Sequence, residues 1–481
     1  MKAEIRDFVR TYVKAIKESN AALFAGAGLS KPAGFVNWKE LLSEVAEDLN
    51  LDIDKETDLI SLAQFHVNER GRGKINQILL EEFTKDSEIT ENHRIISNLP
   101  IQTFWTTNYD TLIEDSLRAA GKRVDVKIRN SNLAVTLPNR QATVYKMHGD
   151  ISLPDEAVIT KDDYENYQHK RKPFTLALQG DLIEKTFLFI GFSFDDPNLQ
   201  YVLSRIRILL GESQRDHYCF MKKVSRSDFP KGNEHDDDYR YAVIRQELQI
   251  KDLKRFRIQV ILVDDYSEIT EILRYIENKI RRLNVFISGS VSDYGEWGES
   301  RIFNFSTQLA KRLISNDQNI ITGFGLGIGS CVISGALEEI YSNPRATAEK
   351  RLLARPFPQV GTSNLKEIWT RYRFDMISRA GISVFLFGNK IHPETGITIE
   401  ADGMIEEFNI SVQTGSIPVP IGATGYTART IWNKVIENFD DYVPDSSLKP
   451  LYEEIGNENN TDEKIIDCVL EIVRRLDEYK Y

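Results

Sequence analysis

The chain has 481 residues, of which 41% are hydrophobic and 28% are charged, and its formal net charge is −11. This length exceeds what one hydrophobic core supports, so we expect two domains. The acidic balance argues against broad nucleic-acid binding, and the absence of long apolar stretches argues against a membrane span or a signal peptide, so we expect a cytoplasmic protein.

Short apolar runs alternate with helical patterns over residues 1–283, which indicates a mainly parallel sheet covered by helices. The expected strands are Ala21–Ala25, Thr103–Thr106, Val144–Met147, Thr186–Ile190, His217–Met221 and Gln259–Val263. We expect a mostly helical insert between the first two strands, from Trp38 to Leu99, which would be placed to form a lid. The polar run 231–238 is typical of an exposed loop. A helix from about Glu268 to Leu283 is expected to close this domain, 1–283.

The α/β pattern then restarts in a smaller second domain, 284–481. Expected strands are Val285–Ser290, a run from Asn319 to Thr322, and Ser383–Phe387. Expected helices lie near Cys331–Tyr341 and Leu365–Arg379. On the second of these helices, the apolar spacing predicts that Arg371 and Arg373 point away from the core. The fold class is therefore α/β with two Rossmann-like domains.

Four short segments occur in one order along the first domain. They are Phe24-Ala-Gly-Ala-Gly-Leu-Ser30, Thr106-Thr-Asn-Tyr-Asp110, Lys146-Met-His-Gly149 and Gly191-Phe-Ser193. The turn at Gly26, Ala27 and Gly28 follows a buried strand, where backbone N–H groups can approach a dinucleotide pyrophosphate. The third glycine of the strict dinucleotide fingerprint is absent, so an ordinary tight turn is the alternative.

The polar residues of these segments suit the cleavage of the bond between nicotinamide and ribose in NAD. Asn108 can bind a ribose hydroxyl or position a water, and Asp110 can accept from the nicotinamide carboxamide. His148 follows a strand end and can act as a general base. Ser30 and Ser193 can donate to phosphate or ribose oxygens. The alternative for Asn108 and Asp110 is a helix cap, which such residues often form after a strand.

The four segments together resemble the NAD-binding core of the sirtuins. That resemblance implies that Asn108 and His148 line the nicotinamide ribose, with His148 as the base. Sirtuin deacylases also carry a zinc module of two C-x-x-C pairs, whereas here residues 151–167 follow the His-Gly segment and the three cysteines lie far apart. Without that module, water is the simplest nucleophile, so we expect hydrolysis of NAD to nicotinamide and ADP-ribose, with no metal and no further cofactor.

A glycine-rich loop marks the second domain. Gly323-Phe-Gly-Leu-Gly-Ile-Gly329 follows an apolar strand and precedes a helix, an arrangement that can bind an anion with backbone N–H groups. It lacks the lysine of a phosphate-binding P-loop, so a tight turn is the alternative. Lys390 follows the strand Ser383–Phe387, where a ligand crevice is expected.

This half resembles the SLOG family, Rossmann-like domains that bind nucleotide-derived signals. The resemblance places signal binding at Gly289, Ser290, Gly323, Gly325, Leu326, Gly327, Arg373, Lys390 and Glu407. Some relatives are phosphoribohydrolases, so catalysis by Glu406 or Glu407 stays open.

A sirtuin-like domain followed by a SLOG domain resembles the effector family of the Thoeris antiphage system. The resemblance implies that a TIR-domain partner makes a cyclic ADP-ribose isomer, that the SLOG domain binds this activator, and that the sirtuin-like domain then depletes NAD. It also implies a homo-oligomer, a tetramer assembled through the sirtuin-like domains. The alternative from another functional class is a non-catalytic NAD or nucleotide sensor or scaffold.

Overall fold

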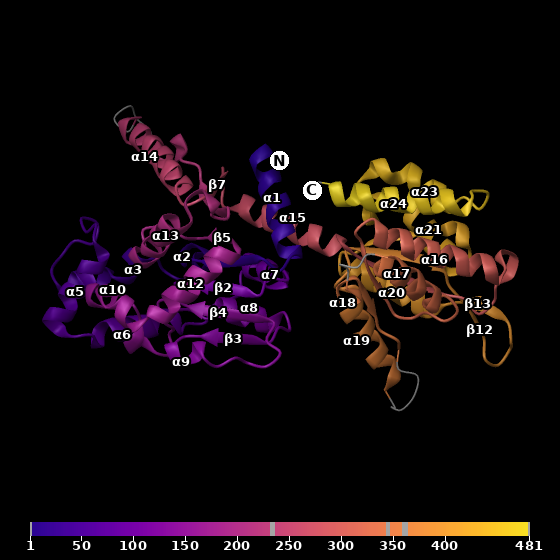
Figure 1. The fold of residues 1–481 in the computed structure, drawn as a ribbon, viewed down its shortest axis with the longest axis horizontal. Coiled ribbons are helices and arrows are strands. Elements are labelled where there is room, and N and C mark those ends of the chain that lie inside the picture. The colour runs from indigo at the N-terminus through magenta and orange to yellow at the C-terminus, as the bar shows by residue number, and fades with distance from the viewer. Residues whose placement is uncertain (1, 231–235, 343–346, 358–363, 480–481) are drawn as a thin grey trace. The chain divides into compact units, whose positions relative to one another are not determined.

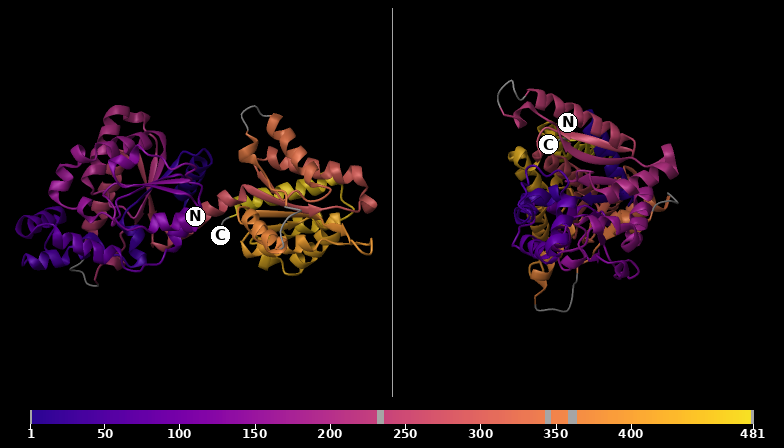
Figure 2. Two further views of the ribbon diagram at one scale, coloured as in Figure 1. Left: turned by 90° about the horizontal axis from the view of Figure 1, so that it is seen from below. Right: turned by 90° about the vertical axis from the view of Figure 1, so that its left-hand side faces the viewer.

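The computed structural model describes residues 2–230, 236–342, 347–357 and 364–479. Its chain divides into two compact units, residues 1–277 and 278–481 (Figure 1). Each unit contains a parallel sheet with helices on both faces (Figure 2). None of the described helices is long and apolar enough to cross a membrane.

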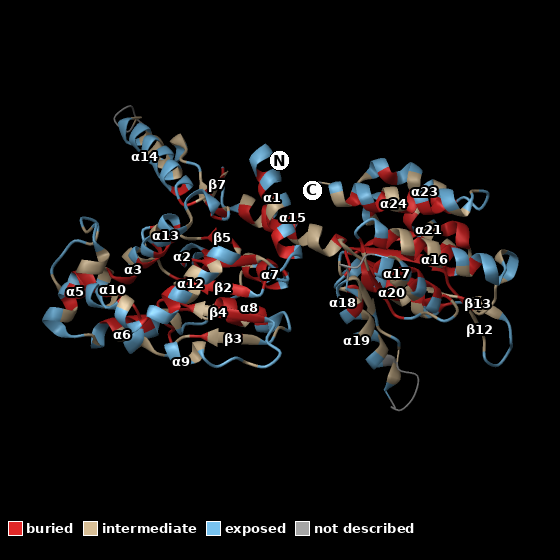
Figure 3. Ribbon diagram, viewed as in Figure 1, coloured by how far each residue is buried: buried red, intermediate tan, exposed pale blue. Residues whose placement is uncertain are grey.

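The sheet of the first unit has seven strands in the order β3-β4-β2-β1-β5-β6-β7, and every neighbouring pair is parallel. The strands are β1 Ala21–Ala25, β2 Thr103–Thr106, β3 Val124–Lys127, β4 Ala142–Lys146, β5 Thr186–Ile190, β6 His217–Lys222 and β7 Ile258–Val263. All residues of β1, β2 and β5 are buried, as expected of central strands that are covered on both faces (Figure 3).

Helices fill the connections of the first unit. They are α1 Ala3–Lys17, α2 Ala27–Ser30, α3 Trp38–Leu41, α4 Ser43–Asp48, α5 Leu59–Arg70, α6 Gly73–Phe83, α7 Glu91–Asn98, α8 Leu112–Ala119, α9 Asn130–Leu133, α10 Lys161–Glu165, α11 Tyr167–Lys170, α12 Lys172–Glu184, α13 Pro197–Leu210, α14 Asp236–Lys254 and α15 Ser267–Arg282. The expected helical insert is confirmed as α3 to α7. The expected loop 231–238 is wrong at its end, because Asp236, Asp237 and Asp238 form the acidic first turn of α14, which a helix N-terminus favours. Residues 231–235 of that expectation lie outside the described part of the chain.

The second unit contains a five-stranded parallel sheet of order β10-β9-β8-β11-β14 and a small antiparallel pair, β12-β13. The strands are β8 Asn284–Ser290, β9 Asn319–Thr322, β10 Leu352–Ala354, β11 Ile382–Phe387, β12 Asn389–Ile391, β13 Thr398–Glu400 and β14 Ile417–Pro420. The helices are α16 Glu299–Ser315, α17 Gly329–Ser342, α18 Ala348–Arg351, α19 Leu365–Ile377, α20 Asp402–Gln413, α21 Tyr426–Glu437, α22 Phe439–Tyr442, α23 Lys449–Gly456 and α24 Asp462–Glu478. The α/β fold class is confirmed in both units.

Candidate functional site

The four sequence segments of the first unit lie at the carboxyl ends of four neighbouring strands, β4, β2, β1 and β5. Ala25 of β1 pairs with Thr106 of β2 and with Ile190 of β5, and Thr106 pairs with Lys146 of β4. Each segment contains or directly follows one of these paired residues, so the sheet brings all four to one edge. Ligands of open α/β sheets bind at this edge.

The glycine turn after β1 packs directly against the segment after β5. The N–H groups of Gly26 and Gly28 donate to the carbonyls of Ile190 and Gly191, both at 2.9 Å. Gly191 has φ +66°, and a Cβ there would lie 2.2 Å from the backbone nitrogen of Leu29, so only glycine fits. Ala27 is the first residue of α2, and no backbone acceptor for its N–H is found in the described part of the chain.

Asn108 and Ser30 are joined across this edge. The Asn108 amide donates to the Gly26 carbonyl at 3.1 Å and to Ser30 Oγ at 3.0 Å, and its backbone N–H donates to Thr106 Oγ1. Both amide hydrogens are therefore used, and no hydrogen bond to its Oδ1 is found in the described residues. This oxygen is the group through which Asn108 can accept from a hydroxyl or a water. Ser193, in contrast, is exposed and is not part of this network.

Asp110 follows β2 at the same edge. One of its carboxylate oxygens has a hydrogen-bond partner, whereas the other has none among the described residues. Its Oδ1 accepts from the N–H of Leu112, the first residue of α8, although the N-cap position of that helix belongs to Thr111. Its Oδ2 is buried and has no hydrogen-bond partner among the described residues, and the same is true of Nε2 of buried His93. Burial lowers the pKa of His93 to about 4, against the opposing charge of Asp110. An unpartnered buried acceptor suits a ligand donor such as an amide.

His148 pairs with an acid that the sequence analysis did not identify. Its Nε2 lies 3.0 Å from Asp196 Oδ2. Tyr164 packs edge-on against the His148 ring at 5.5 Å, and its hydroxyl lies 3.4 Å from the same Asp196 oxygen. The sequence pattern that could have pointed to Asp196 is the run Ser193-Phe-Asp-Asp-Pro197, because an acid directly before proline is typical of a helix start.

A buried charged cluster supports the strand that precedes His148. Lys146 is fully buried, and its ammonium lies 3.1 Å from both Glu114 and Asp150. Burial alone would lower the pKa of Lys146, but the charges of the two acids outweigh it and the pKa is raised. The ammonium also donates to the Asp110 carbonyl. This lysine therefore ties together the β4 end, the β2 end and α8 beneath the site.

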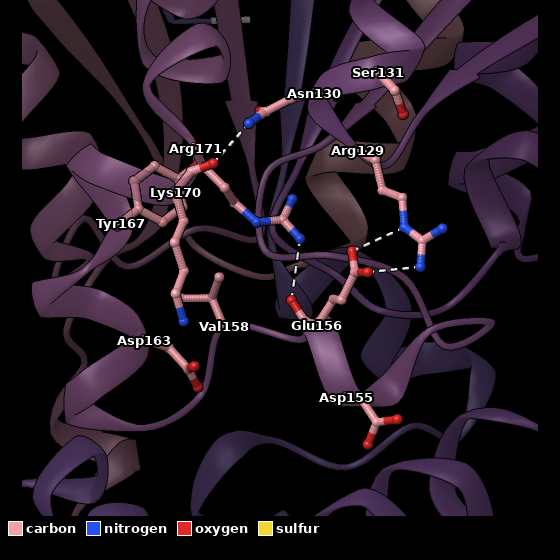
Figure 4. Close-up of a pocket in the computed structure, with 10 residues that line it drawn as sticks. All are labelled: Arg129, Asn130, Ser131, Asp155, Glu156, Val158, Asp163, Tyr167, Lys170 and Arg171. Atoms are coloured by element: carbon pink, nitrogen blue, oxygen red, sulfur yellow. Dashed lines mark hydrogen bonds and ion pairs between the residues drawn. The ribbon is translucent and has the colours of Figure 1, made fainter.

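A hollow of about 370 Å³ lies beside the His148 segment, and none of the predicted NAD-binding residues lines it (Figure 4). Two of its residues hold that segment: the N–H of Val158 donates to the His148 carbonyl, and the Tyr167 hydroxyl donates to the Met147 carbonyl. In the hollow, Arg171 donates to the Ile128 and Glu156 carbonyls. These contacts fix the backbone behind His148.

The second unit contains a larger pocket, of about 730 Å³, at the carboxyl edge of its sheet. All nine predicted signal-binding residues line it: Gly289, Ser290, Gly323, Gly325, Leu326, Gly327, Arg373, Lys390 and Glu407. The glycine loop fits tightly, because a Cβ on Gly325 would lie 1.8 Å from the Gly289 carbonyl oxygen. Phe357 and Trp369 add aromatic surface to the lining.

Arg373 faces the pocket and is much less exposed than Arg371 on the same helix. Its side chain is only 12% exposed, lies over the Phe357 ring, and pairs with Glu406 at 2.7 Å and Glu407 at 3.3 Å. The acids on neighbouring α20 draw it inward, whereas Arg371 is exposed as expected. Helical spacing alone cannot detect such a partner on another element.

The cationic side chains of this pocket are already paired with acidic ones. Lys390 pairs with Asp402, and Glu407 accepts from Ser288 Oγ at 2.6 Å in addition to Arg373. Burial raises the pKa of Glu407, against the opposing effects of Ser288 and Arg373. An anionic ligand must therefore compete with these carboxylates.

Two family models match the chain. Residues 102–244, which include Asn108, His148 and Asp196, match the SIR2-like domain, and residues 268–476 match the Sir2- and TIR-associating SLOG family. The expected order of a sirtuin-like domain and a SLOG domain is thereby confirmed.

Relatives match over nearly the whole chain. The NAD(+) hydrolase ThsA of Bacillus cereus is 49% identical over 98% of this chain and 98% of its own length. The ThsA proteins of Cytobacillus dafuensis and Acinetobacter baumannii are 46% and 47% identical over at least 96% of both chains. These matches favour the enzyme over the non-catalytic sensor or scaffold. The chain therefore belongs to the ThsA family of NAD(+) hydrolases.

Proposed function

We propose that this NAD+ hydrolase is activated by a cyclic ADP-ribose isomer bound in the second unit, and that it depletes cytoplasmic NAD+ in defence against phages. One contrast carries the proposal. Asn108, Asp110 and His148 are 7%, 3% and 3% exposed, whereas the pocket of the second unit is wide and accessible. A buried catalytic site together with an open ligand pocket suits an enzyme that is switched on by a signal.

The first step of the proposed chemistry is cleavage of the C1′–N bond between ribose and nicotinamide. Asn108 binds a ribose hydroxyl or the attacking water through its free Oδ1. His148 takes the proton of that water as it attacks C1′. Nicotinamide leaves with the electron pair of the broken bond, and the products are nicotinamide, ADP-ribose and one proton.

Binding of NAD+ uses the remaining residues of the edge. The unpartnered Asp110 Oδ2 accepts from the carboxamide N–H₂ of nicotinamide. The pyrophosphate lies near the glycine turn, with the Ala27 N–H as its donor there. Ser30 and exposed Ser193 supply hydroxyl groups to the phosphates or the adenosine ribose.

The signal is bound by groups suited to a nucleotide with two phosphates. Arg373 and Lys390 exchange their carboxylate partners for phosphate oxygens, and the glycine loop supplies N–H groups. Phe357 and Trp369 offer faces for an adenine ring. The family description, which associates this SLOG domain with TIR domains, supports a TIR-domain protein as the source of the signal.

A homo-oligomer completes the proposal, with a tetramer as the expected size. Helix α14 carries Tyr241, Ile244 and Leu248, each more than half exposed and spaced three and four apart. Its first turn is acidic and its last turn contains Lys251 and Lys254. Antiparallel pairing of α14 with that of a second copy covers the apolar residues and joins opposite charges. Light scattering of Ile244→Asp is expected to show a smaller assembly than the wild type.

The deciding experiment measures NAD+ consumption by the purified chain, with and without cyclic ADP-ribose isomers, and separates nicotinamide from ADP-ribose. Turnover that rises with one isomer supports the proposal. Equal turnover with and without every isomer would contradict activation by this signal, while leaving the hydrolase assignment in place.

A further inference from the structure

The proposed chemistry assigns no role to the contact between His148 and Asp196 in the first unit. The Nε2 and Oδ2 atoms lie 3.0 Å apart, and the two side chains are only 4% and 8% exposed. The contact is an ion pair and not a hydrogen bond, and no other partner of Nε2 is found in the described residues. Catalytic contacts of this kind often align only when substrate binds.

The local fold holds Asp196 in this position. Its Oδ1 caps α13 by accepting from the N–H of Leu199 at 2.8 Å, which leaves Oδ2 for His148 and Tyr164. Two residues earlier, Phe194 has φ +63°, a conformation that costs energy for a residue with a side chain. The chain thus adopts strained backbone directly before the acid that contacts His148.

Asp196 is a carboxylate at neutral pH. Burial acts to raise its pKa, but the charge and contact of His148 and the N–H of Leu199 outweigh burial and lower the pKa. The other titratable groups around the pair are Tyr109, Tyr164 and Tyr167, whose pKa values are all raised, mainly by burial. These tyrosines stay neutral, so Asp196 is the charge that His148 meets.

We propose that Asp196 is a positioning residue for NAD+ cleavage: it fixes the ring of His148 through Nε2 and stabilises the imidazolium that forms when His148 takes a proton from water. Nδ1 is then the nitrogen that receives the proton. The inference rests on the proposed role of His148 as the base. It predicts a loss of turnover, and not of NAD+ binding, when the charge of Asp196 is removed.

The test uses Asp196→Asn in the full chain, because asparagine caps a helix as well as aspartate does. We expect kcat to fall about 100-fold, with the Kd for NAD+ within about threefold of the wild type. Asp196→Glu, which restores a charge, is expected to recover part of kcat.

Two controls separate this role from helix capping. Asp58→Asn changes the capping acid of α5 in the same unit and is expected to leave kcat and its pH profile unchanged. Asp196→Ser keeps a capping oxygen without a charge, and it replaces Asp196→Asn if that variant does not fold. Wild-type kcat in the folded variant would overturn the inference. If His148→Ala is also fully active, the proposed function of His148 fails as well.

Discussion

The two ligand sites of this chain differ in how their polar groups are satisfied. In the first unit, Asn108 is hydrogen-bonded to its neighbours, and the buried Oδ2 of Asp110 lacks a hydrogen-bond partner among the described residues. In the second unit, the pocket is open and Arg373 and Lys390 are already paired with acids. Under the proposed function, the first site keeps an unsatisfied acceptor for the substrate, whereas the second keeps its cations in ion pairs that an anionic ligand would displace.

This difference indicates how each site should respond to mutation. Groups that act in a transition state affect kcat, whereas groups that exchange one anion for another affect only the concentration of ligand required. The predictions below test that distinction, from the largest expected effect to the smallest.

Replacing His148 or Asn108 by alanine is expected to have the largest effect. Either change removes a group that we propose to act on the reacting ribose, so kcat should fall by about 10³-fold while the Kd for NAD+ changes little. Steady-state kinetics with saturating activator and calorimetric binding of NAD+ measure the two quantities. A weaker Kd with normal kcat would instead make these residues part of ground-state binding.

Arg373→Ala is expected to raise the half-activating signal concentration about 100-fold, because the change removes a largely buried cation that we propose to contact a phosphate of the signal. The Kd for NAD+ in the first unit should not change. Arg371→Ala is the matched control, since Arg371 lies on the same helix but is exposed. Normal activation of the Arg373 variant would move the signal site elsewhere.

Much of the fold could be predicted because its central strands are continuous apolar runs. β1 and β5 occur where Ala21–Ala25 and Thr186–Ile190 were expected. Strand β3 was missed because its sequence, Val-Asp-Val-Lys, alternates with charged residues. Those charges, Asp125 and Lys127, are nearly buried and pair with each other at 2.8 Å, an arrangement that no local pattern reveals.

The site residues that directly follow a strand could be predicted from the sequence. Because β2 and β4 are parallel neighbours, Asn108 and His148, which follow them, lie at the same edge of the sheet. Asp196 and the inward position of Arg373 were not predictable, because each depends on a partner from a distant segment: His148 in one case, and Glu406 and Glu407 in the other. Contacts between elements decide these orientations.

Buried histidines make the first unit sensitive to acid. Burial lowers the pKa of His217 to about 3 and that of His93 to about 4, below the value near 6.5 of the unfolded chain. Because the folded pKa values are depressed, this stability is fully present above about pH 6.5 and is lost as the pH falls toward 4. At pH 5 each histidine accounts for a loss of about 2 kcal/mol.

His217→Asn tests this sensitivity, since its amide oxygen can replace Nδ1 as the acceptor for the N–H of Phe187. At pH 8 the free energy of unfolding of the variant is expected to be lower than that of the wild type. Between pH 8 and pH 5, it is expected to decrease by about 2 kcal/mol less than that of the wild type. Urea unfolding at the two pH values measures this difference. An unchanged difference would mean that His217 is already charged in the folded unit.

Glu406→Gln is expected to have the smallest effect and to act in the opposite direction. Glu406 lies 2.7 Å from Arg373, but its side chain is 36% exposed, so water weakens the pair. Removing its charge frees Arg373 for phosphate, and the half-activating concentration should fall about fivefold. Glu437→Gln, an exposed change that does not line the pocket, should leave that concentration unchanged. If the half-activating concentration instead rises with Glu406→Gln, Glu406 itself binds ribose hydroxyls of the signal. Its ion pair with Arg373 is then not one that the signal has to displace.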